Sequence, residues 1–292
     1  MSIRISRSSS NRAKAKRTLF GSVSTRHAAI CKPIRSCNTP IRKRPTLDTL
    51  QHLDEQRLVW DRKPLIRALY GHYHQMLIQQ CGRGSIAEIG AGCASLKSSY
   101  PDILSIDIVA SPWVDLVGDA ERLPLADDSV GNLVLLDVLH HIRQPFRFLE
   151  EAARVLEAGG RLVMLEPGIS PLSRVIYGAA HPEPIDMHAD VFADSALSGS
   201  DPFDSNQAIP TLLFDQGVGR ALSRIKHFEV AHLDWLGFPS YPLSGGFRPW
   251  RLLPNFMLGA CLSAEALAPS MLRRWLGFRL FVVLRKPHPN AD

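Results

Sequence analysis

Short apolar runs alternate with amphipathic stretches from residue 85 onward, and this alternation predicts buried strands connected by helices. The runs at 86–89, 132–139 and 161–168 are largely apolar, as in parallel strands that are covered on both faces. Between the last two runs, apolar residues of the stretch 145–160 recur at helical spacing, and Gly159-Gly160 are expected to end that helix. The pattern predicts an α/β fold with a Rossmann-like, doubly wound, mostly parallel sheet.

Further helices and strands are predicted on both sides of this core. Residues 46–82 show apolar positions every four residues, with Pro64 in the first turn of a helix. We expect residues 168–206 to be irregular, because four prolines and many polar residues interrupt them. After them we expect a helix at 208–226 and strands at 228–236 and 278–285, with an insert between these strands, at 239–277, that is helical in two pieces.

The connection after Asp107 is too short for a crossover helix. Only a few residues separate Asp107 from the next apolar position, Val114, whereas a crossover needs roughly a dozen residues. We therefore expect no helix between the second and third strands, and a short third strand at about 114–117.

The segment 85–107 has the layout of a nucleotide-type site. A buried strand leads into Gly90-Ala91-Gly92, and the next strand ends on Asp107. Glycines let the backbone approach a ligand that a Cβ atom would exclude. An acid at the tip of the second strand is able to accept hydrogen bonds from both hydroxyls of a ribose.

Two residues argue against a dinucleotide at this turn. The dinucleotide fingerprint has a third glycine where Ser95 stands. Glu88, two residues before Gly90, would repel a pyrophosphate and suits a cation such as the amino group of a methionine moiety. An NAD-dependent enzyme is therefore disfavoured, and a tight turn without a ligand remains an alternative.

The motifs EIGAG, SID, GDAERLP, LLDVLHHI, RVLEAGG and LVMLEP occur in one order along the chain. In that order and at these spacings they resemble the class I S-adenosylmethionine (SAM) methyltransferases, in particular the methyltransferase type 11 branch, over roughly residues 84–168. A less specific similarity, in pieces such as SNQAIPTLLF and YPLSGGF, is to methyltransferases found among bacterial surface-polysaccharide genes.

The resemblance implies SAM as cofactor and a set of residues that bind it. Glu88, Gly90 and Gly92 would line the methionine end, and Asp107 would accept from the ribose hydroxyls. The remaining positions would contact the adenine or line the crevice at the carboxyl end of the fourth strand: Asp119, Ala120, Asp137 and Leu139. The alternatives are that Asp119 is a turn acid and Asp137 a solvated strand end.

Two further expectations follow from the resemblance. The family usually has a third glycine where this chain has Ala94; we expect tighter packing there, unless the turn requires a positive φ. Methyltransferases of this class often carry an N-terminal helix over the cofactor, so residues 46–82 are interpreted as a helical lid. Simple packing on the edge of the sheet is the alternative.

Methyl transfer to oxygen needs alignment of the reacting atoms and benefits from a general base. His140 and His181 are the catalytic candidates; His140 could also be a wall of the cofactor pocket. Weaker substrate-contact candidates follow the fifth strand: Glu183, Asp186, His188, Asp201, Asp204, Asn206 and Gln207. We expect no metal site, because His181, Glu183 and His188 have no established ligand spacing.

Charge is distributed unevenly along the 292 residues. Residues 1–45 hold 12 Lys or Arg and no acid, so the remainder has 34 − 12 = 22 basic and 28 acidic residues and a net charge of −6. We interpret 1–45 as a disordered basic tail before a single methyltransferase domain, 46–292. The tail also fits an organellar targeting segment, a nucleic-acid-binding arm or a wrongly chosen start codon.

Composition and the C-terminal insert bear on compartment and partners. Five scattered cysteines favour reduced thiols and a cytoplasmic location, and no apolar run approaches the ~20 residues of a membrane span. The insert places apolar residues, including Trp250 and Phe256, next to Arg248 and Arg251, which suits peripheral contact with a membrane or a helix packed over the substrate cleft.

The sequence therefore predicts methyl transfer from SAM to a small-molecule, carrier-linked or lipid-linked acceptor, most simply at oxygen. The alternative function is an RNA-binding protein or RNA methyltransferase that uses the basic tail.

Overall fold

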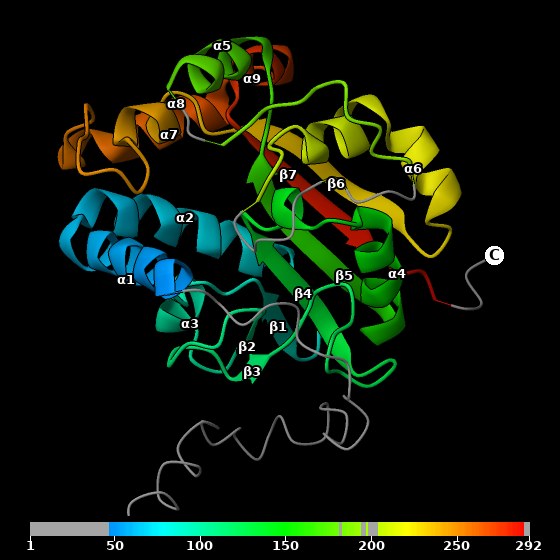
Figure 1. The fold of residues 1–292 in the computed structure, drawn as a ribbon. Coiled ribbons are helices and arrows are strands. Elements are labelled where there is room, and N and C mark those ends of the chain that lie inside the picture. The colour runs from blue at the N-terminus through cyan, green and yellow to red at the C-terminus, as the bar shows by residue number, and fades with distance from the viewer. Residues whose placement is uncertain (1–46, 181–182, 194–196, 198–203, 289–292) are drawn as a thin grey trace, which may run out of the picture.

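A seven-stranded sheet forms the centre of the protein in the computed structural model, which describes residues 47–180, 183–193, 197 and 204–288 (Figure 1). The predicted tail, 1–45, lies outside these residues. The strand order is β3-β2-β1-β4-β5-β7-β6, and only β7 runs antiparallel to its neighbours. The strands are β1 (Ile86–Ile89), β2 (Leu104–Asp107), β3 (Leu116–Val117), β4 (Val130–Leu136), β5 (Leu156–Pro167), β6 (Glu229–Leu236) and β7 (Arg279–Arg285). The predicted Rossmann-like, doubly wound sheet is confirmed.

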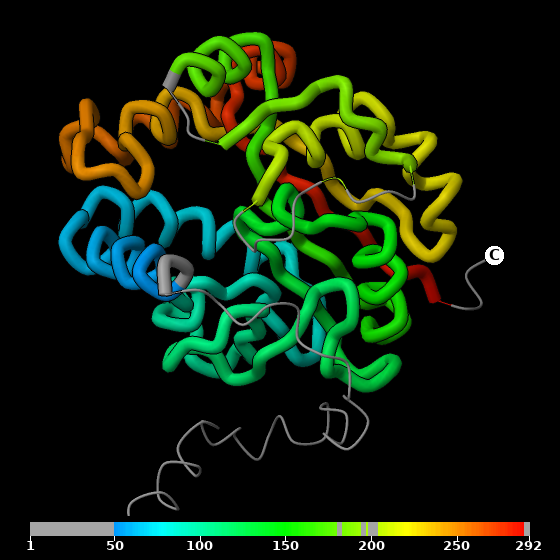
Figure 2. The backbone as a smooth tube through the Cα atoms, viewed as in Figure 1, coloured from blue at the N-terminus to red at the C-terminus, as the bar shows by residue number. Residues whose placement is uncertain are grey.

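Helices cover both faces of this sheet (Figure 1). They are α1 (Leu47–Arg62), α2 (Pro64–Gln80), α3 (Ser95–Ser99), α4 (Pro145–Val155), α5 (Pro171–Ala180), α6 (Val218–Arg224), α7 (Ser240–Ser244), α8 (Leu258–Leu267) and α9 (Ser270–Leu276), with short 3₁₀ or π turns η2 (Leu139–His141), η3 (Thr211–Gln216) and η4 (Asn255–Met257). Helix α7 lies against α2, so segments from opposite ends of the described chain are side by side (Figure 2). Among the described residues, no helix has the length and hydropathy to cross a bilayer.

Alternation along the buried strands explains why a separate core forms on each face of the sheet. Leu133 and Leu135 of β4 face the core under α4, whereas Val134, between them, faces the core under α2. Successive strand side chains point to opposite faces, so a continuous apolar run fits a sheet that is covered on both sides.

The N-terminal helices both pack on the sheet and reach the glycine turn. Helix α2 supplies Leu69, Tyr73 and Leu77 to the core on its face of the sheet. Helix α1 lies over the turn after β1, where the Arg57 Nη1 donates to the carbonyl of Cys93 at 3.0 Å. The predicted absence of a helix between β2 and β3 is also confirmed, since residues 108–115 are described and contain none.

Two predicted boundaries in the core are wrong. The fourth strand was expected to reach Leu139 but ends at Leu136, because Asp137 adopts a left-handed φ of 60° that interrupts the ladder. Helix α4 was expected to run to Gly159-Gly160 but ends at Val155, because Leu156 already pairs with Val130 in the sheet.

Three predictions for the C-terminal half are also corrected. The stretch 168–206 is not irregular throughout, since α5 forms in it. The helix expected at 208–226 is broken at Gly217, where a Cβ atom would lie 2.6 Å from the carbonyl oxygen of Leu212. The insert before β7 forms α7, η4, α8 and α9 rather than two pieces.

Candidate functional site

The glycine turn follows the carboxyl end of β1, at the point in the sheet where the strand order reverses. β1 pairs with β2 on one side and with β4 on the other, which is the switch point at which ligands bind in doubly wound sheets. Gly90 has a φ of 68°, and a Cβ atom on it would come within 2.5 Å of the Val138 side chain. Gly92 has a φ of 51°, and the nearest atom to its Cβ would be 3.9 Å away. Glycine is therefore required sterically at the first position and conformationally at both.

Asp107, at the tip of β2, fastens this turn. Its Oδ2 accepts the N–H of Gly92 at 2.7 Å and its Oδ1 accepts the N–H of Val109, also at 2.7 Å. The side chain is 8% exposed, and burial raises the pKa of Asp107 against the opposing effect of these backbone donors. Each carboxylate oxygen has a second lone pair, so two ribose hydroxyls are still able to donate to it.

Glu88 lies beside Asp107 on the neighbouring strand and is more deeply buried. It is 4% exposed, and the Ser105 hydroxyl donates to its Oε2 at 3.3 Å. Burial, above all, raises the pKa of Glu88 to about 8. A buried carboxyl with one hydroxyl donor is suited to a cationic ligand group, because a positive charge would restore the ionised form.

Ala94 occupies a left-handed conformation, with φ 53° and ψ 45°, immediately before α3. The expectation of tighter packing without strain is therefore wrong, since the turn does need positive φ. For an alanine this conformation costs about 1–2 kcal/mol, because Cβ approaches the following carbonyl oxygen.

Asp119 forms a local turn, and its neighbour is packed against the core. The Oδ1 of Asp119 accepts the N–H of Glu121 at 2.9 Å, which is the turn-acid arrangement considered as its alternative. Ala120 is partly buried against the core under α4. The carbonyl of Asp107 accepts the N–H of Gly118 at 2.9 Å and so keeps this segment beside the tip of β2.

The two predicted residues after β4 have structural partners. Asp137 forms a two-pronged ion pair with Arg279, and the Tyr70 hydroxyl donates to its Oδ2 at 3.1 Å. It is therefore not a solvated strand end. The Leu139 side chain does not face the crevice but is fully buried in the core under α4, and its N–H donates to Glu166 at 2.9 Å.

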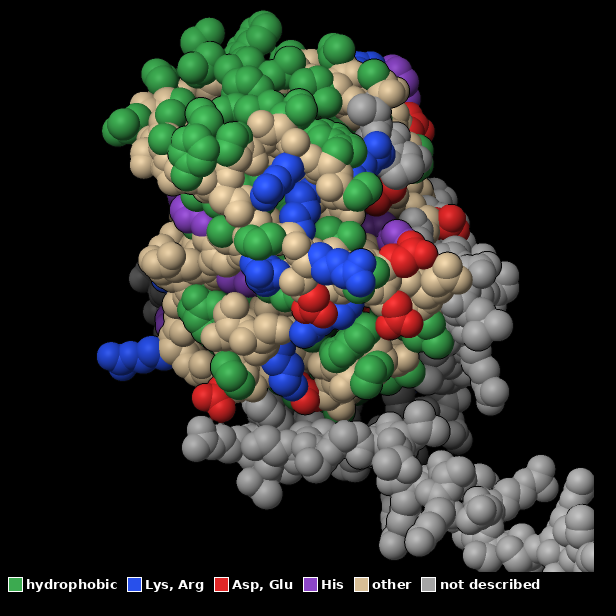
Figure 3. Space-filling view, turned by 90° about the vertical axis from the view of Figure 1, so that its left-hand side faces the viewer, with side chains coloured by type: hydrophobic (Ala, Val, Ile, Leu, Met, Phe, Trp, Pro, Cys, Tyr) green, Lys and Arg blue, Asp and Glu red, His purple; other side chains and the backbone are tan. Residues whose placement is uncertain are grey.

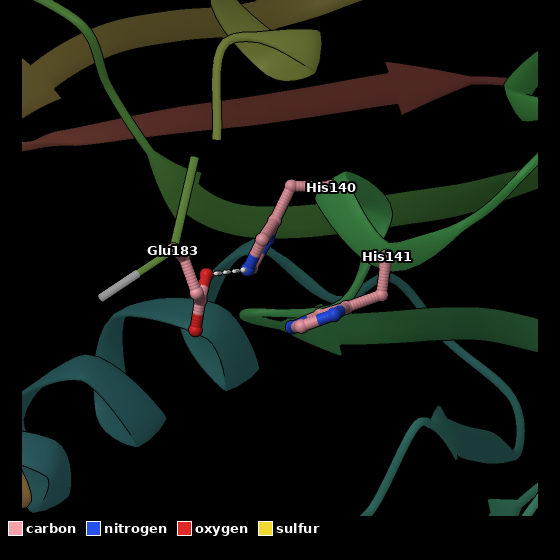
Figure 4. A group of neighbouring side chains, drawn as sticks. All are labelled: His140, His141 and Glu183. Atoms are coloured by element: carbon pink, nitrogen blue, oxygen red, sulfur yellow. Dashed lines mark ion pairs between the residues drawn. The ribbon is translucent and has the colours of Figure 1, made fainter. Parts of the chain in front are cut away.

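His140 is held between two carboxylates. Its Nδ1 lies 2.8 Å from Glu166 Oε2, and its Nε2 lies 3.4 Å from Glu183 Oε2 (Figure 4). Burial alone would lower the pKa of His140, but the hydrogen bonds to Glu166 and Glu183 raise it to about 9. The pKa of Glu183 falls well below its usual value, because the hydrogen bond and charge of His140 outweigh its burial.

His141 packs against His140, with ring centroids 4.1 Å apart, and turns toward the same carboxylate (Figure 4). Burial, and then the charge of His140, lower the pKa of His141 to about 4. The potential ligand atoms of His140, His141 and Glu183 all lie within 4.8 Å of one another. The sequence interpretation missed this combination, because it grouped Glu183 with His181 and His188.

The segment that contains Asn206 and Gln207 is hydrogen-bonded to this cluster. The Asn206 N–H donates to the carbonyl of His140 at 2.9 Å, and the Gln207 Nε2 donates to Glu183 Oε2 at 3.1 Å. Asp186 and the exposed His188 form a local turn with each other. The catalytic candidate His181 and the substrate candidate Asp201 lie outside the described residues.

The sequence interpretation also missed Glu166 and Arg279. Each is a charged residue inside a largely apolar strand, and each is almost completely buried. That contrast is a usable signal, because a buried charge requires a partner, although the sequence does not reveal which one.

Comparison with known proteins agrees with this geometry. Residues 81–164 match the family model described as a methyltransferase domain. The predicted resemblance of this part of the chain to methyltransferases is therefore confirmed.

Curated relatives match over the same kind of short region. A demethylmenaquinone methyltransferase of Paenarthrobacter aurescens is 31% identical over 109 residues, which is 32% of this chain and 43% of the relative. An uncharacterized methyltransferase of Mycobacterium bovis is 33% identical over 91 residues, which is 26% of this chain and 37% of the relative. The chain thus spans less than half the length of these relatives.

Among solved structures, a SAM-dependent methyltransferase from Thermotoga maritima, described as a possible histamine N-methyltransferase, aligns with 82% of this chain and 97% of its own. The sequence identity is 16% and the TM-score is 0.48.

Proposed function

We propose that the chain, which carries a methyltransferase domain over residues 81–164, transfers a methyl group from SAM to an acceptor oxygen. One observation carries the proposal: Glu88, near the end of β1, and Asp107, at the end of β2, lie on neighbouring strands two register positions apart, around a glycine turn at the switch point. This combination suits a ligand that joins a cationic amino acid to a ribose.

Each predicted cofactor residue has a role in this proposal. Glu88 would pair with the amino group of the methionine moiety, and Asp107 would accept from the ribose hydroxyls. Asp119 would accept from the adenine amino group, and the backbone of Ala120 would contact the ring. Asp137 and Leu139 would act through the shape of the loop after β4, since their side chains are engaged elsewhere.

The reaction breaks the methyl–sulfur bond and forms a methyl–oxygen bond, so a positively charged sulfonium becomes a neutral thioether. The acceptor hydroxyl releases its proton to water. The leaving group is already activated by its charge, and alignment of oxygen, methyl and sulfur is the main task of the protein. With a pKa of about 9, His140 keeps its own proton at neutral pH, so its proposed role as general base is confined to higher pH.

An apolar surface on the C-terminal insert supports a lipid-linked acceptor. We call this surface the apolar cap. It consists of large exposed side chains in the loop before η4, in η4 and on α8 and α9: Trp250, Leu252, Phe256, Met257, Leu267, Met271, Leu272 and Trp275. Hydrophobic side chains gather over this end of the molecule, with Lys and Arg below them (Figure 3). Between Arg251 and Arg273 the one charged residue is Glu265, which is buried and accepts the N–H of Ser240 at 2.6 Å.

Such a surface favours peripheral contact with an anionic membrane. Exposed apolar patches with aromatic and basic borders sit in the interfacial region of a bilayer. Docking there would bring the protein to a lipid-linked acceptor that carries a hydroxyl group. RNA binding through residues 1–45 receives no support from the matches reported above.

Methyl transfer is tested with SAM that carries an isotope-labelled methyl group. The full chain is incubated with a lipid extract and, separately, with an aqueous extract and with RNA, and the labelled product is identified. Calorimetric titrations with SAM and with NAD accompany the assay. Binding of SAM with label in a lipid fraction agrees with the proposal, whereas binding of NAD alone contradicts it.

A further inference from the structure

We propose that His140, His141 and Glu183 bind one divalent transition-metal ion, for which Zn²⁺ is the best match. The cluster joins two segments that are distant in sequence, η2 after β4 and the loop after α5, and its potential ligand atoms lie within 4.8 Å of one another (Figure 4). Two imidazoles and one carboxylate form the ligand set of catalytic zinc sites that keep an open position. Mg²⁺ and Ca²⁺ prefer oxygen ligands and fit this set less well.

The separation of two ligand atoms fits a metal ion between them. His140 Nε2 and Glu183 Oε2 are 3.4 Å apart, whereas a direct charge-assisted hydrogen bond measures about 2.7–2.9 Å. Two ligands about 2.1 Å from a tetrahedral ion are about 3.4 Å apart. If Nδ1 of His140 carries the ring proton, His140 Nε2 and Glu183 Oε2 are both hydrogen-bond acceptors and require a cation between them. A proton meets that requirement in the protein alone, and a metal ion would replace it.

Residues around the cluster already orient its ligands. Glu166 Oε2 lies 2.8 Å from His140 Nδ1, and its Oε1 accepts the N–H groups of Val138 and Leu139 at 2.9 Å. A carboxylate on the second ring nitrogen is the usual support of a metal-bound histidine, because it fixes the tautomer and the ring orientation.

Hydrogen-bond donors of the neighbouring segment hold the Glu183 carboxylate in place. The Ser205 hydroxyl and the Gln207 amide donate to its Oε2 at 3.2 and 3.1 Å. Glu166 and Glu183 together supply two negative charges around the imidazoles, which favours a divalent cation over a neutral ligand.

The role of the ion in the reaction rests on the proposed methyl transfer, but its binding does not. The ion would hold the acceptor oxygen at its open position and lower the pKa of that hydroxyl. The hydroxyl proton would pass to water, and the resulting oxyanion would take the methyl group as the methyl–sulfur bond breaks.

The test is a titration of the chelator-treated full chain with Zn²⁺, followed by calorimetry, and with Co²⁺, followed by its visible spectrum. We expect one ion per chain and cobalt d–d bands without thiolate charge transfer. His141→Gln and Glu183→Gln should each weaken binding at least tenfold. His188→Gln, an exposed histidine of the same loop, is the control and should leave binding unchanged. Circular dichroism shows whether each variant folds, and a Zn²⁺-dependent rise in the Tm of the unaltered chain is an independent readout.

Three results would overturn the site: no saturable binding, equal binding in the His141 and Glu183 variants, or a thiolate band that moves the ion to a cysteine. SAM affinity is measured on the same preparations. If metal binding fails while SAM binds, only the metal site is lost. If the metal binds but SAM does not, only the proposed function is lost.

Discussion

The buried Arg279 and the partly exposed Asp137 form a two-pronged ion pair that joins the start of β7 to the loop after β4. Arg279 is 1% exposed, and its guanidinium also lies over the rings of Tyr241 and Tyr73, at 4.6 and 5.5 Å from their centroids. The pair lies at the carboxyl end of β4, so it fixes the loop that leads to His140. Asp137 therefore has a structural role in the site, independent of any ligand.

The first prediction concerns this pair. Asp137→Ala leaves a guanidinium buried without its counter-charge and should lower the free energy of unfolding by about 3–5 kcal/mol. The double substitution with Arg279→Met should cost less than Asp137→Ala alone, because it removes the stranded charge as well. Urea unfolding measures the free energy of unfolding of Asp137→Ala, of Arg279→Met and of the double variant. If the losses of the two single variants simply add in the double variant, the prediction is contradicted.

A matched control lies on the same strand. Arg285 of β7 pairs with Glu229 at a site where both side chains are about half exposed. Arg285→Met should therefore change the free energy of unfolding by no more than about 1 kcal/mol, as is usual for surface ion pairs.

Asp107→Asn provides the second prediction. The substitution removes a negative charge that would accept from the ribose hydroxyls, so SAM affinity should fall by about 1–3 kcal/mol. The asparagine oxygen still accepts one of the two backbone N–H groups now bound by Asp107, so the fold should persist with a lower Tm. Calorimetry measures the affinity. Asp54→Asn, an exposed acid of α1, is the control, and an unchanged dissociation constant for Asp107→Asn would remove this residue from the site.

Glu88 carries the third prediction, a dependence of SAM binding on pH. Its pKa of about 8 keeps the buried carboxyl protonated at neutral pH, and pairing with the cationic amino group of SAM requires ionisation. SAM affinity should therefore rise with pH up to about 8, where the amino group begins to lose its own charge. Glu88→Gln should weaken binding and abolish this rise; a slope that persists in the variant would assign it to another group.

The same residue should lower the stability of the free protein at high pH. The unfolded chain releases the proton near the ordinary Glu value of 4.5, while the folded chain retains it up to about 8. Stability contributed by this group is thus complete below pH 4.5 and is lost as the pH rises to 8. At pH 8 and above, Glu88→Gln should unfold at a higher temperature than the unaltered chain, even though it binds SAM less well.

The sheet and the glycine turn were predictable because their causes are local. The apolar runs around Ile89 and Leu135 indicate strands directly, and Gly90 and Gly92 mark a turn whose backbone excludes a side chain. Asp107 follows from its position at the end of the second run. Each of these inferences needs only a few neighbouring residues.

The partners of buried charges were not predictable in this way. Arg279 meets Asp137 across 142 positions, and His140 meets Glu166 across 26. Whether such residues come into contact depends on which strands become neighbours and on where each strand ends. The wrong limit for β4 has the same origin, because the left-handed turn at Asp137 is stabilised by a partner from the far end of the chain.

Ala94 gives the fourth prediction. Ala94→Gly would relieve the strain of a φ of 53° but would give the unfolded chain more freedom, which costs about 0.4–1 kcal/mol. We expect a net stabilisation of up to about 1 kcal/mol and an unchanged SAM affinity. Ala94→Val, which puts a β-branched side chain into the same buried left-handed position, should be strongly destabilising. Thermal unfolding compares them, and a stable valine variant would contradict the conformation.

The apolar cap supplies the fifth prediction, which is tested with vesicles that contain or lack anionic lipid. Phe256 and Leu267 are each 85% exposed, so replacing both by serine should leave the Tm almost unchanged while it removes apolar area from the membrane contact. We expect at least a tenfold weaker binding to anionic vesicles in a sedimentation assay. Leu58→Ser is the control, because Leu58 is exposed on α1, away from the cap. Salt should weaken binding through the basic border at Arg248 and Arg251. Vesicle binding that is unaffected by the double substitution would contradict a membrane contact through the cap.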